Sequence, residues 1–177
     1  MEYFTIRRAE VKDAPDIARV RITGWKQSYK GIVPDVLLAK LDMEADRARV
    51  EQGLTDPANK TLRFVLELDK KIVGIGACGK ARDAEDPKRG EVYAIYLLDE
   101  AKRQGLGANF MREMAEALAA NGYESLQLNV LKQNVPARKF YEKLGGKLEG
   151  NGVFKFEGVE LPDVMYVWED IRNLIEK

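Results

Sequence analysis

The chain carries the stretch EVYAIYLLDEAKRQGLGA at residues 91–108, and this stretch indicates more about the fold than any other. Its first half, Glu91 to Leu98, is apolar and rich in β-branched and aromatic residues, which predicts a strand buried on both faces. Its second half contains Gly105 and Gly107 and leads into a helical pattern. Two glycines at a strand–helix junction allow a tight turn and a close approach of the backbone to a ligand.

A long helix is predicted to start after Gly105 and to run to about Asn121. Its buried stripe is expected to consist of Leu106, Phe110, Met114 and Leu118, which recur at helical spacing. The first turn of such a helix has unpaired N–H groups and the positive end of the helix dipole, so it suits an anionic phosphate. Lys102 and Arg103 add positive charge beside it. Taken alone, the segment is equally typical of an ordinary strand–helix turn with solubilising charges.

Strands and helices are also predicted on both sides of this stretch. Before it, the pattern predicts a strand at 3–8, helices at 12–29, 34–41 and 43–53, strands at 62–69 and 71–81, and a charged loop at 83–90. After it, the pattern predicts a strand at 125–131, a helix at 135–144, strands at 147–157 and 161–168, and a short polar helix. We therefore expect an α/β (α+β) fold, in which residues 1–177 form a single domain with a mixed, mostly antiparallel sheet flanked by helices.

The composition excludes several kinds of chemistry. The 177 residues include no histidine and one cysteine, and 29 Lys and Arg balance 29 Asp and Glu. A histidine-containing triad, a His-ligated zinc site and an intrachain disulfide are therefore excluded, and no metal is expected. Cys78 lies in an apolar run and is expected in the core. The charge balance argues against a nucleic-acid module.

The hydropathy pattern shows neither a secretory signal nor an apolar stretch of about 18 residues. We therefore expect no membrane association and a cytoplasmic protein.

A second informative segment, NVPARKFYEKLGG, occupies residues 134–146. Asn134 is suited to cap a helix that has Pro136 in its first turn. Tyr141 shares a helical face with Ala137 and Leu144. On the residues alone, Tyr141 fits a core tyrosine whose hydroxyl reaches water.

The two segments together resemble motifs A and B of the GNAT superfamily of acyl-CoA-dependent N-acetyltransferases. The family's loop pattern, Arg/Gln-x-x-Gly-x-Gly/Ala, is matched by residues 102–107, with Lys102 in the first position. The family's Asn-x-x-Ala-x-x-Phe-Tyr-Glu-Lys-x-Gly-Phe run is matched by residues 134–146, with Gly146 in place of the final Phe. The similarity covers roughly residues 3–168. A Walker loop or a dinucleotide fingerprint fits less well, because Ala108 and Phe110 stand where those motifs need other residues.

The resemblance implies how acetyl-CoA would bind. The strands at 91–98 and 125–131 would splay apart, and the pantetheine arm would lie between them along Ile95, Tyr96 and Leu97. Asn134 would contact the pantetheine or mark the start of the helix, and Arg138 would lie near the CoA phosphates. The pyrophosphate would rest on the backbone amides of Arg103, Gln104, Gly105, Leu106, Gly107 and Ala108.

The resemblance also implies catalytic roles. Tyr141 would lie near the thioester sulfur as general acid. Glu91 is the expected base, because histone-acetylating members of the family hold a glutamate at similar spacing. A glutamate at a strand start is often simply solvated, so water or another group remains an alternative base.

The acceptor site is less defined by the sequence. Trp25, Tyr29, Tyr93 and Phe154 are expected to line it, and Glu91 or Asp163 is expected to attract a cationic amine, although core packing explains the aromatic residues equally well. The expected activity is transfer of an acetyl group from acetyl-CoA to a primary amine of a small molecule or a protein. A small molecule is favoured, because no basic or acidic tail suggests docking to a macromolecule.

The alternative function is a non-catalytic acyl-CoA-binding regulatory module. Both readings need Gly105 and Gly107, whereas only the enzyme needs Tyr141. A homodimer is common in the family, and the sequence leaves this open.

Overall fold

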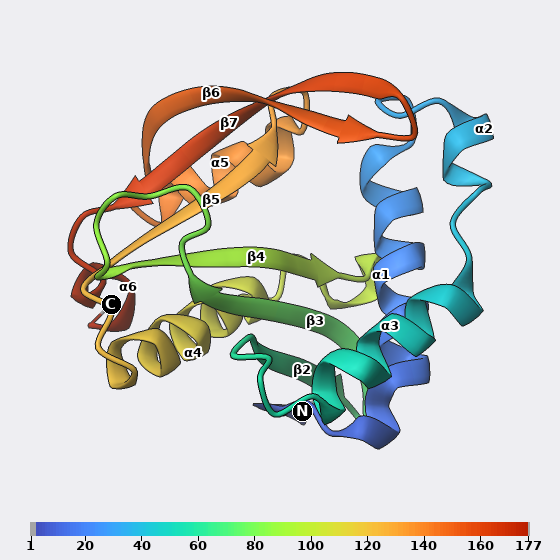
Figure 1. The fold of residues 1–177 in the computed structure, drawn as a ribbon, viewed down its shortest axis with the longest axis horizontal. Helices are drawn as coiled ribbons and strands as arrows, with labels where there is room; N and C mark the ends of the chain where they lie inside the picture. Colours follow the sequence, from blue (N-terminus) through green and yellow to red (C-terminus); the bar gives the residue numbers. More distant parts are fainter. Residues whose placement is uncertain (1–2, 177) are drawn as a thin grey trace. The chain divides into compact units, whose positions relative to one another are not determined.

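The computed structural model describes residues 3–176, which form one seven-stranded sheet and the helices that flank it (Figure 1). The strands are β1 (Phe4–Arg8), β2 (Leu62–Leu68), β3 (Lys71–Lys80), β4 (Arg89–Leu97), β5 (Ser125–Leu131), β6 (Lys147–Phe156) and β7 (Val159–Trp168). The helices are α1 (Ala14–Tyr29), α2 (Asp35–Leu38), α3 (Met43–Thr55), α4 (Leu106–Ala120), α5 (Val135–Lys143) and α6 (Arg172–Ile175), with 3₁₀ turns η1 (Val11–Asp13) and η2 (Asp99–Ala101).

The strands are hydrogen-bonded in the order β1-β2-β3-β4-β5-β7-β6. The β1–β2, β2–β3, β5–β7 and β6–β7 ladders are antiparallel, whereas the β4–β5 ladder is parallel. A parallel pair cannot be joined by a tight turn, and α4 supplies the crossover between β4 and β5. The predicted fold class, a mixed and mostly antiparallel sheet flanked by helices, is confirmed.

Two tight hairpins use turns with left-handed backbone. Asp69 and Lys70 between β2 and β3 have φ values of 48° and 67°, and Glu157 and Gly158 between β6 and β7 have φ values of 49° and 80°. Positive φ at both central residues matches the twist of the flanking strands. The two strands predicted at 62–69 and 71–81 are therefore joined by a tight, charged turn.

The described chain forms two compact units, each considered by itself. The first comprises the described residues up to Cys78 together with Ala94–Phe110, and the second comprises Gly79–Tyr93 and the residues from Met111 onward. The assignment of residues 1–177 to a single domain stays a prediction.

The first unit is built on an apolar cluster shared by helices and strands. Its buried members are Ala14, Ile17 and Val20 of α1, Val50 of α3, Val65 of β2, Ile72 and Ile75 of β3, and Leu98 after β4. Leu98 also donates a backbone hydrogen bond to the Val73 carbonyl, at 2.9 Å. The chain is therefore anchored directly before the glycine-containing loop, which fixes where that loop begins.

The second unit contains β5, β7 and β6, and Figure 1 shows α5 beside β5 and β7. Tyr141 of α5 packs against Tyr166 and Trp168 of β7, with ring centroids 6.1 and 6.3 Å apart. The contact fixes the rotation of α5 about its axis, because a large aromatic side chain on one helical face meets two others.

Several predicted elements differ in detail. β4 was expected to be buried on both faces, but only Gly90, Glu91 and Val92 are buried, whereas Tyr93–Leu97 are half-buried. The first helix begins at Ala14 rather than 12, because η1 precedes it. The predicted buried stripe of α4 is confirmed, since all four of its residues are buried.

The single cysteine lies in the core, as predicted. Cys78 of β3 is fully buried, and burial raises the pKa of its thiol to about 12. Among the helices of residues 3–176, none combines the length and the apolar character needed to cross a membrane.

Candidate functional site

The loop after β4 adopts a backbone that few residues tolerate. Arg103 and Gly105 have φ values of 64° and 76°. A positive φ costs a residue with a Cβ roughly 1–2 kcal/mol, and such strain recurs where a loop is shaped for a ligand. A side chain built at Gly105 would meet no atom within 4 Å, so Gly105 serves the backbone conformation rather than close packing.

This loop presents a row of backbone donors. Within residues 3–176, the N–H groups from Arg103 to Ala108 donate no hydrogen bond to another protein group, and the Asn109 N–H is the first to find a carbonyl, that of Gly105 at 3.2 Å. These donors lie at and before the start of α4, where the helix dipole is positive. Backbone N–H groups in this arrangement can donate hydrogen bonds to an oxyanion such as a pyrophosphate.

Two polar side chains of the loop bond back to the η2 turn. Lys102 Nζ pairs with Asp99 Oδ1 at 2.7 Å, and Gln104 Nε2 donates to the Glu100 carbonyl at 2.8 Å. The Asp99 N–H in turn donates to Gln27 Oε1 of α1 at 3.1 Å. The side chains of Lys102 and Gln104 are thus directed to the η2 turn.

Hydrogen bonds of Tyr96 anchor the end of β4 to α1. The Tyr96 hydroxyl accepts a hydrogen bond from Trp25 Nε1 at 2.7 Å and also bonds Tyr29, and burial raises the pKa of Tyr96. The side chain of Leu97 occupies space left by Gly74, where an added Cβ would lie 2.6 Å from Leu97 Cδ2. Ile95 is half-buried in the same strand. Tyr96 therefore contributes to structure through its side chain and has only its backbone for a ligand.

The parallel ladder between β4 and β5 is short. It pairs Arg89 with Ser125, Gly90 with Leu126 and Glu91 with Gln127, and extends no further among the described residues. β4 itself continues to Leu97 and β5 to Leu131. The two strands are thus paired over only part of their length. The predicted splay requires that their pairing stops before the strands end.

Helix α5 starts as predicted. Asn134 caps it by accepting a hydrogen bond from the Ala137 N–H at 3.4 Å. Tyr141 is 7% exposed. Arg138 donates to the Tyr166 hydroxyl and to the Lys132 carbonyl, both at 3.1 Å, and its pKa is raised by the bond to Tyr166. Arg138 thus has internal partners in the second unit.

The final glycine of the second segment has a packing explanation. A Cβ at Gly146 would lie 2.7 Å from Trp168 Cζ2. The indole also donates from Nε1 to the Leu144 carbonyl at 3.1 Å. Trp168 therefore fills the space beside the helix end, and the departure of Gly146 from the usual Phe is compensated within this sequence.

Glu91 lies in a closed set of hydrogen bonds. Its carboxylate is 2% exposed and accepts from the Arg82 backbone N–H and from Gln127 Nε2, both at 3.2 Å. Arg82 also donates from its guanidinium, with Nε 2.9 Å from Oε2 and Nη2 in closer contact. The Arg82 guanidinium also lies over the Tyr93 ring, with Cζ 4.8 Å from the ring centroid. The desolvation expected for Glu91 is present, and it comes with a cationic partner.

The residues expected to line the acceptor site are distributed over both units. Trp25 and Tyr29 of α1 meet edge to face, with centroids 4.9 Å apart. Tyr93 donates its hydroxyl to the Lys80 carbonyl. Phe154 stacks on Phe156 in β6, with centroids 6.4 Å apart. Each aromatic side chain therefore has a structural contact within its own unit.

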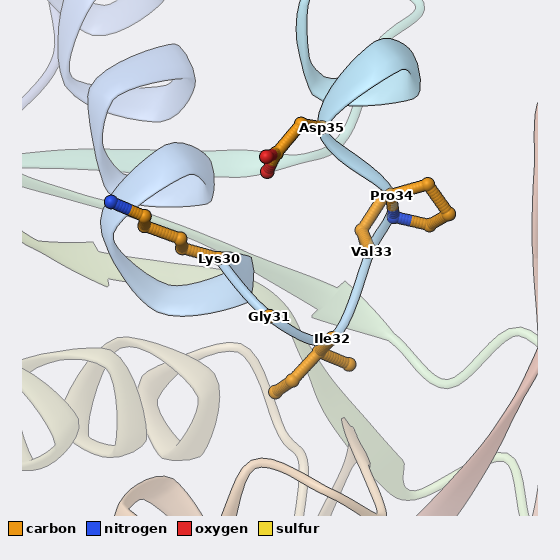
Figure 2. Close-up of a pocket in the computed structure, with 6 residues that line it drawn as sticks. All are labelled: Lys30, Gly31, Ile32, Val33, Pro34 and Asp35. Carbon is orange, nitrogen blue, oxygen red and sulfur yellow. The ribbon is translucent and has the colours of Figure 1, made fainter.

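A pocket of about 430 Å³ follows α1 and was not predicted from the sequence. It is lined by Lys30, Gly31, Ile32, Val33, Pro34 and Asp35. Figure 2 shows these residues along one bend of the chain, with Ile32 at its tip and Lys30 and Asp35 on its two arms. Gly31 has a φ of 82°, and the N–H groups of Ile32 and Val33 both donate to the Tyr29 carbonyl. Gly31 and Pro34 are typical of a break between two helices, but such a pattern does not indicate a pocket.

Comparisons with known proteins agree in the kind of protein they find. A family described as acetyltransferase (GNAT) family matches residues 27–146. The chain is 32% identical over 171 residues to the uncharacterized N-acetyltransferase YuaI of Bacillus subtilis (strain 168), covering 96% of this chain and 95% of that protein. It is 26% identical over 166 residues to the probable N-acetyltransferase Rv2775 of Mycobacterium tuberculosis (strain ATCC 25618 / H37Rv), covering 91% of each.

Solved structures show the same fold. The PaiA N-acetyltransferase from Thermoplasma acidophilum, in complex with coenzyme A, is similar with a TM-score of 0.74 and 18% identity, over 91% of this chain and 98% of that one. The putative acetyltransferase YncA from Salmonella typhimurium, with its cofactor acetyl-CoA, is similar with a TM-score of 0.67 and 16% identity, over 93% and 92%.

Proposed function

This chain belongs to the GNAT family of acetyltransferases, and from that premise we propose that it transfers an acetyl group from acetyl-CoA to a primary amine of a small molecule. The amine nitrogen attacks the thioester carbonyl carbon, a C–N bond forms and the C–S bond breaks. The amine loses a proton and the CoA thiolate gains one. The observation that carries the proposal is the row of backbone N–H groups from Arg103 to Ala108, which have no acceptor among the described residues.

In this proposal the CoA pyrophosphate binds the loop before α4. The N–H groups of Arg103, Gln104, Gly105, Leu106, Gly107 and Ala108 act as donors. Support comes from the left-handed backbone at Arg103 and Gly105, because left-handed residues recur in the backbone nests that bind anions. Two solved structures with the same fold hold coenzyme A or acetyl-CoA, which supports the same ligand here.

The pantetheine arm is proposed to bind along the end of β4, with backbone groups of Ile95 and Leu97 as partners. The short β4–β5 ladder supports this, because it ends at Glu91. Asn134 is proposed to contact the arm as well as to cap α5. Arg138 is proposed to meet a CoA phosphate, which requires it to exchange the contact with Tyr166 or Lys132 for the phosphate.

Tyr141 is the proposed general acid. Its phenol has an ordinary pKa of about 10, so it stabilises the departing thiolate through a hydrogen bond or a proton transfer. Its position on α5 supports the role, because packing against Tyr166 and Trp168 restricts the ring. A fixed ring holds the donor in one place, which is what catalysis needs from an acid.

Glu91 is the proposed base. An amine with an ordinary pKa of about 10.4 is mostly protonated at neutral pH and must lose a proton before it attacks. Arg82 and Gln127 both donate hydrogen bonds to the carboxylate, so Glu91 accepts a proton from the amine only after the Arg82 side chain moves aside. Arg82 is 61% exposed, so it has the room to do so.

The test measures release of the CoA thiol from acetyl-CoA across a panel of amines, together with the thermal stability of the protein with and without acetyl-CoA. We expect acetyl-CoA to raise the unfolding temperature, because a ligand at 100-fold its dissociation constant stabilises by about 2.7 kcal/mol. We also expect amine-dependent thiol release. Stabilisation without thiol release would favour a regulatory acyl-CoA-binding module, and absence of both would refute acyl-CoA binding.

Replacement of Glu91 tests the base. Glu91→Gln is expected to flatten the acidic limb of the pH–rate profile, because the titrating base is removed. An unchanged profile would assign the proton to water or another group.

A further inference from the structure

The carboxylate of Asp163 in β7 is unusual within the second unit. It is half-buried, yet in the part of the chain that the structure describes it has neither a hydrogen-bond donor nor a cation as partner. Burial is the sole cause that raises its pKa. A half-buried charge without a partner destabilises a fold, so its presence calls for an explanation other than stability.

The neighbouring strand leaves space for this carboxylate. Gly152 of β6 is paired with Asp163, and a Cβ on Gly152 would lie 2.6 Å from Asp163 Oδ1. That distance is well inside van der Waals contact, so any residue other than glycine would displace the carboxylate. Gly152 is exposed, and the carboxylate therefore lies over bare backbone next to solvent.

An aromatic ring follows on the same face. Phe154 is paired with Leu161, one alternate position along the β6–β7 ladder from Gly152 and Asp163. Paired and alternate residues share one face of a sheet, so Phe154 and Asp163 are neighbours on it. Ammonium and guanidinium groups bind both carboxylates and aromatic rings, so these two neighbouring side chains suit such a cation.

Asp163 lies on the same side of the sheet as Glu91, the proposed base. Gln127, which donates to Glu91, is paired with Val167 of β7, and Val167 and Asp163 are alternate positions of one face. Tyr166, which meets α5, has the opposite parity and faces the other side. Asp163 therefore lies on the Glu91 side of the sheet and not on the side that α5 covers.

We propose that Asp163, Gly152 and Phe154 form a cation-binding subsite, so that the acceptor amine carries a second positive charge that binds there. This inference rests on the proposed function and names its substrate class: a diamine or an amine with a guanidinium group. Asp163 is then a specificity-determining residue that binds the part of the acceptor that does not react.

The experiment compares α,ω-diaminoalkanes with monoaminoalkanes of the same chain length in the thiol-release assay. Asp163→Asn is expected to lower kcat/KM for the diamines by about 10- to 100-fold, the range for a hydrogen bond to a charged group, and to leave the monoamines unchanged. Glu160→Gln is the matched control, because it removes an exposed carboxylate from the same strand. It is expected to change neither.

A second variant fills the space beside Asp163 and keeps its carboxylate. Gly152→Ala places a methyl group against Asp163 Oδ1 and is expected to reduce diamine turnover selectively as well. The unfolding temperature of Asp163→Asn is expected to be unchanged or higher, since the native carboxylate has no donor or cation among residues 3–176 to lose. A lowered unfolding temperature with equal loss for both amine classes would identify a structural role and overturn the inference.

The cation-binding subsite can also be tested if the protein does not transfer acetyl groups. If the natural chain released no thiol with any amine, direct calorimetric binding of a diamine to the natural chain and to Asp163→Asn would still test the subsite. Equal binding to both would overturn it, and weaker binding to Asp163→Asn alone would support it.

Discussion

Tyr141 has a buried ring and a proposed chemical role at its hydroxyl, and the two can be separated by one substitution. Tyr141→Phe keeps the ring that packs against Tyr166 and Trp168. We expect kcat to fall by about 10²–10⁴ with little change in the unfolding temperature. Tyr3→Phe, at a residue that is 74% exposed, is the control. Full activity of Tyr141→Phe on the natural acceptor would remove the acid role.

Glu91 and Arg82 form an ion pair of unequal burial, because Glu91 is 2% exposed and Arg82 is 61% exposed. Removal of the exposed partner leaves a buried carboxylate without its cation, whereas removal of the buried partner leaves a cation in solvent. We therefore expect Arg82→Gln to lower the free energy of unfolding by about 1–3 kcal/mol, and Glu91→Gln to lower it by less. Urea unfolding of both variants measures the difference. The reverse order would show that Glu91 is not held as described.

At the residue level, the sequence predicted the cap at Asn134 and the core position of Cys78, because each follows from local or compositional rules. It did not predict the pairing of Glu91 with Arg82. The two residues are nine positions apart across a loop, and the register that joins them depends on the whole sheet.

The loop between β4 and α4 allows a matched pair of glycine substitutions at the element level. Gly105 and Gly122 lie before and after α4, both have a positive φ, and neither has an atom within 4 Å of an added Cβ. Alanine at either position is expected to cost about 1–2 kcal/mol of stability through backbone strain alone. Only Gly105→Ala is expected to reduce the stabilisation by acetyl-CoA, measured by thermal shift. An equal loss for Gly122→Ala would assign the effect to general destabilisation.

Among the elements, the long periodic helix α4 and the strand β5 were predicted nearly to the residue, because periodicity is strong over many residues. The burial of β4 was overestimated. An apolar composition indicates a strand that avoids water, but it does not distinguish burial by protein from burial by a bound ligand. The pocket at 30–35 was missed for a related reason, since its walls are backbone and turn residues without a distinctive pattern.

For the whole molecule, we expect the free energy of unfolding to fall mainly at acidic pH. The chain has no histidine, so no side chain ordinarily titrates near neutrality. The pKa of Asp13 is lowered, chiefly by its hydrogen bonds to Arg7, so the folded state binds this proton less readily than the unfolded state. Asp13 therefore contributes stability above an unfolded pKa of about 3.9, and this contribution is lost as the pH falls through the lower folded pKa.

Replacement of Asp13 by Asn removes this carboxylate and its pH-dependent contribution to stability. The free energy of unfolding should be lower than that of the natural chain at neutral pH, and the two should converge as the pH falls below about 4. Urea unfolding at a series of pH values measures both curves. A constant difference at every pH would mean that the pair with Arg7 does not contribute through its charge.

The sequence predicted the fold class of the whole molecule, because every part of the chain follows the element order of one family. It did not predict the acceptor. The motifs that resemble the family are short and local in the sequence. The proposed acceptor subsite joins Asp163 and Phe154, whose proximity depends on strand register.

The burial of Cys78 makes the protein convenient to assay. A thiol with no exposed surface and a pKa of about 12 is nearly inert to disulfide reagents while the chain is folded. Such a reagent should therefore report free coenzyme A without a background from the protein. Because the chain has one cysteine, the same colour change in denaturant would count unfolded molecules, one thiol for each.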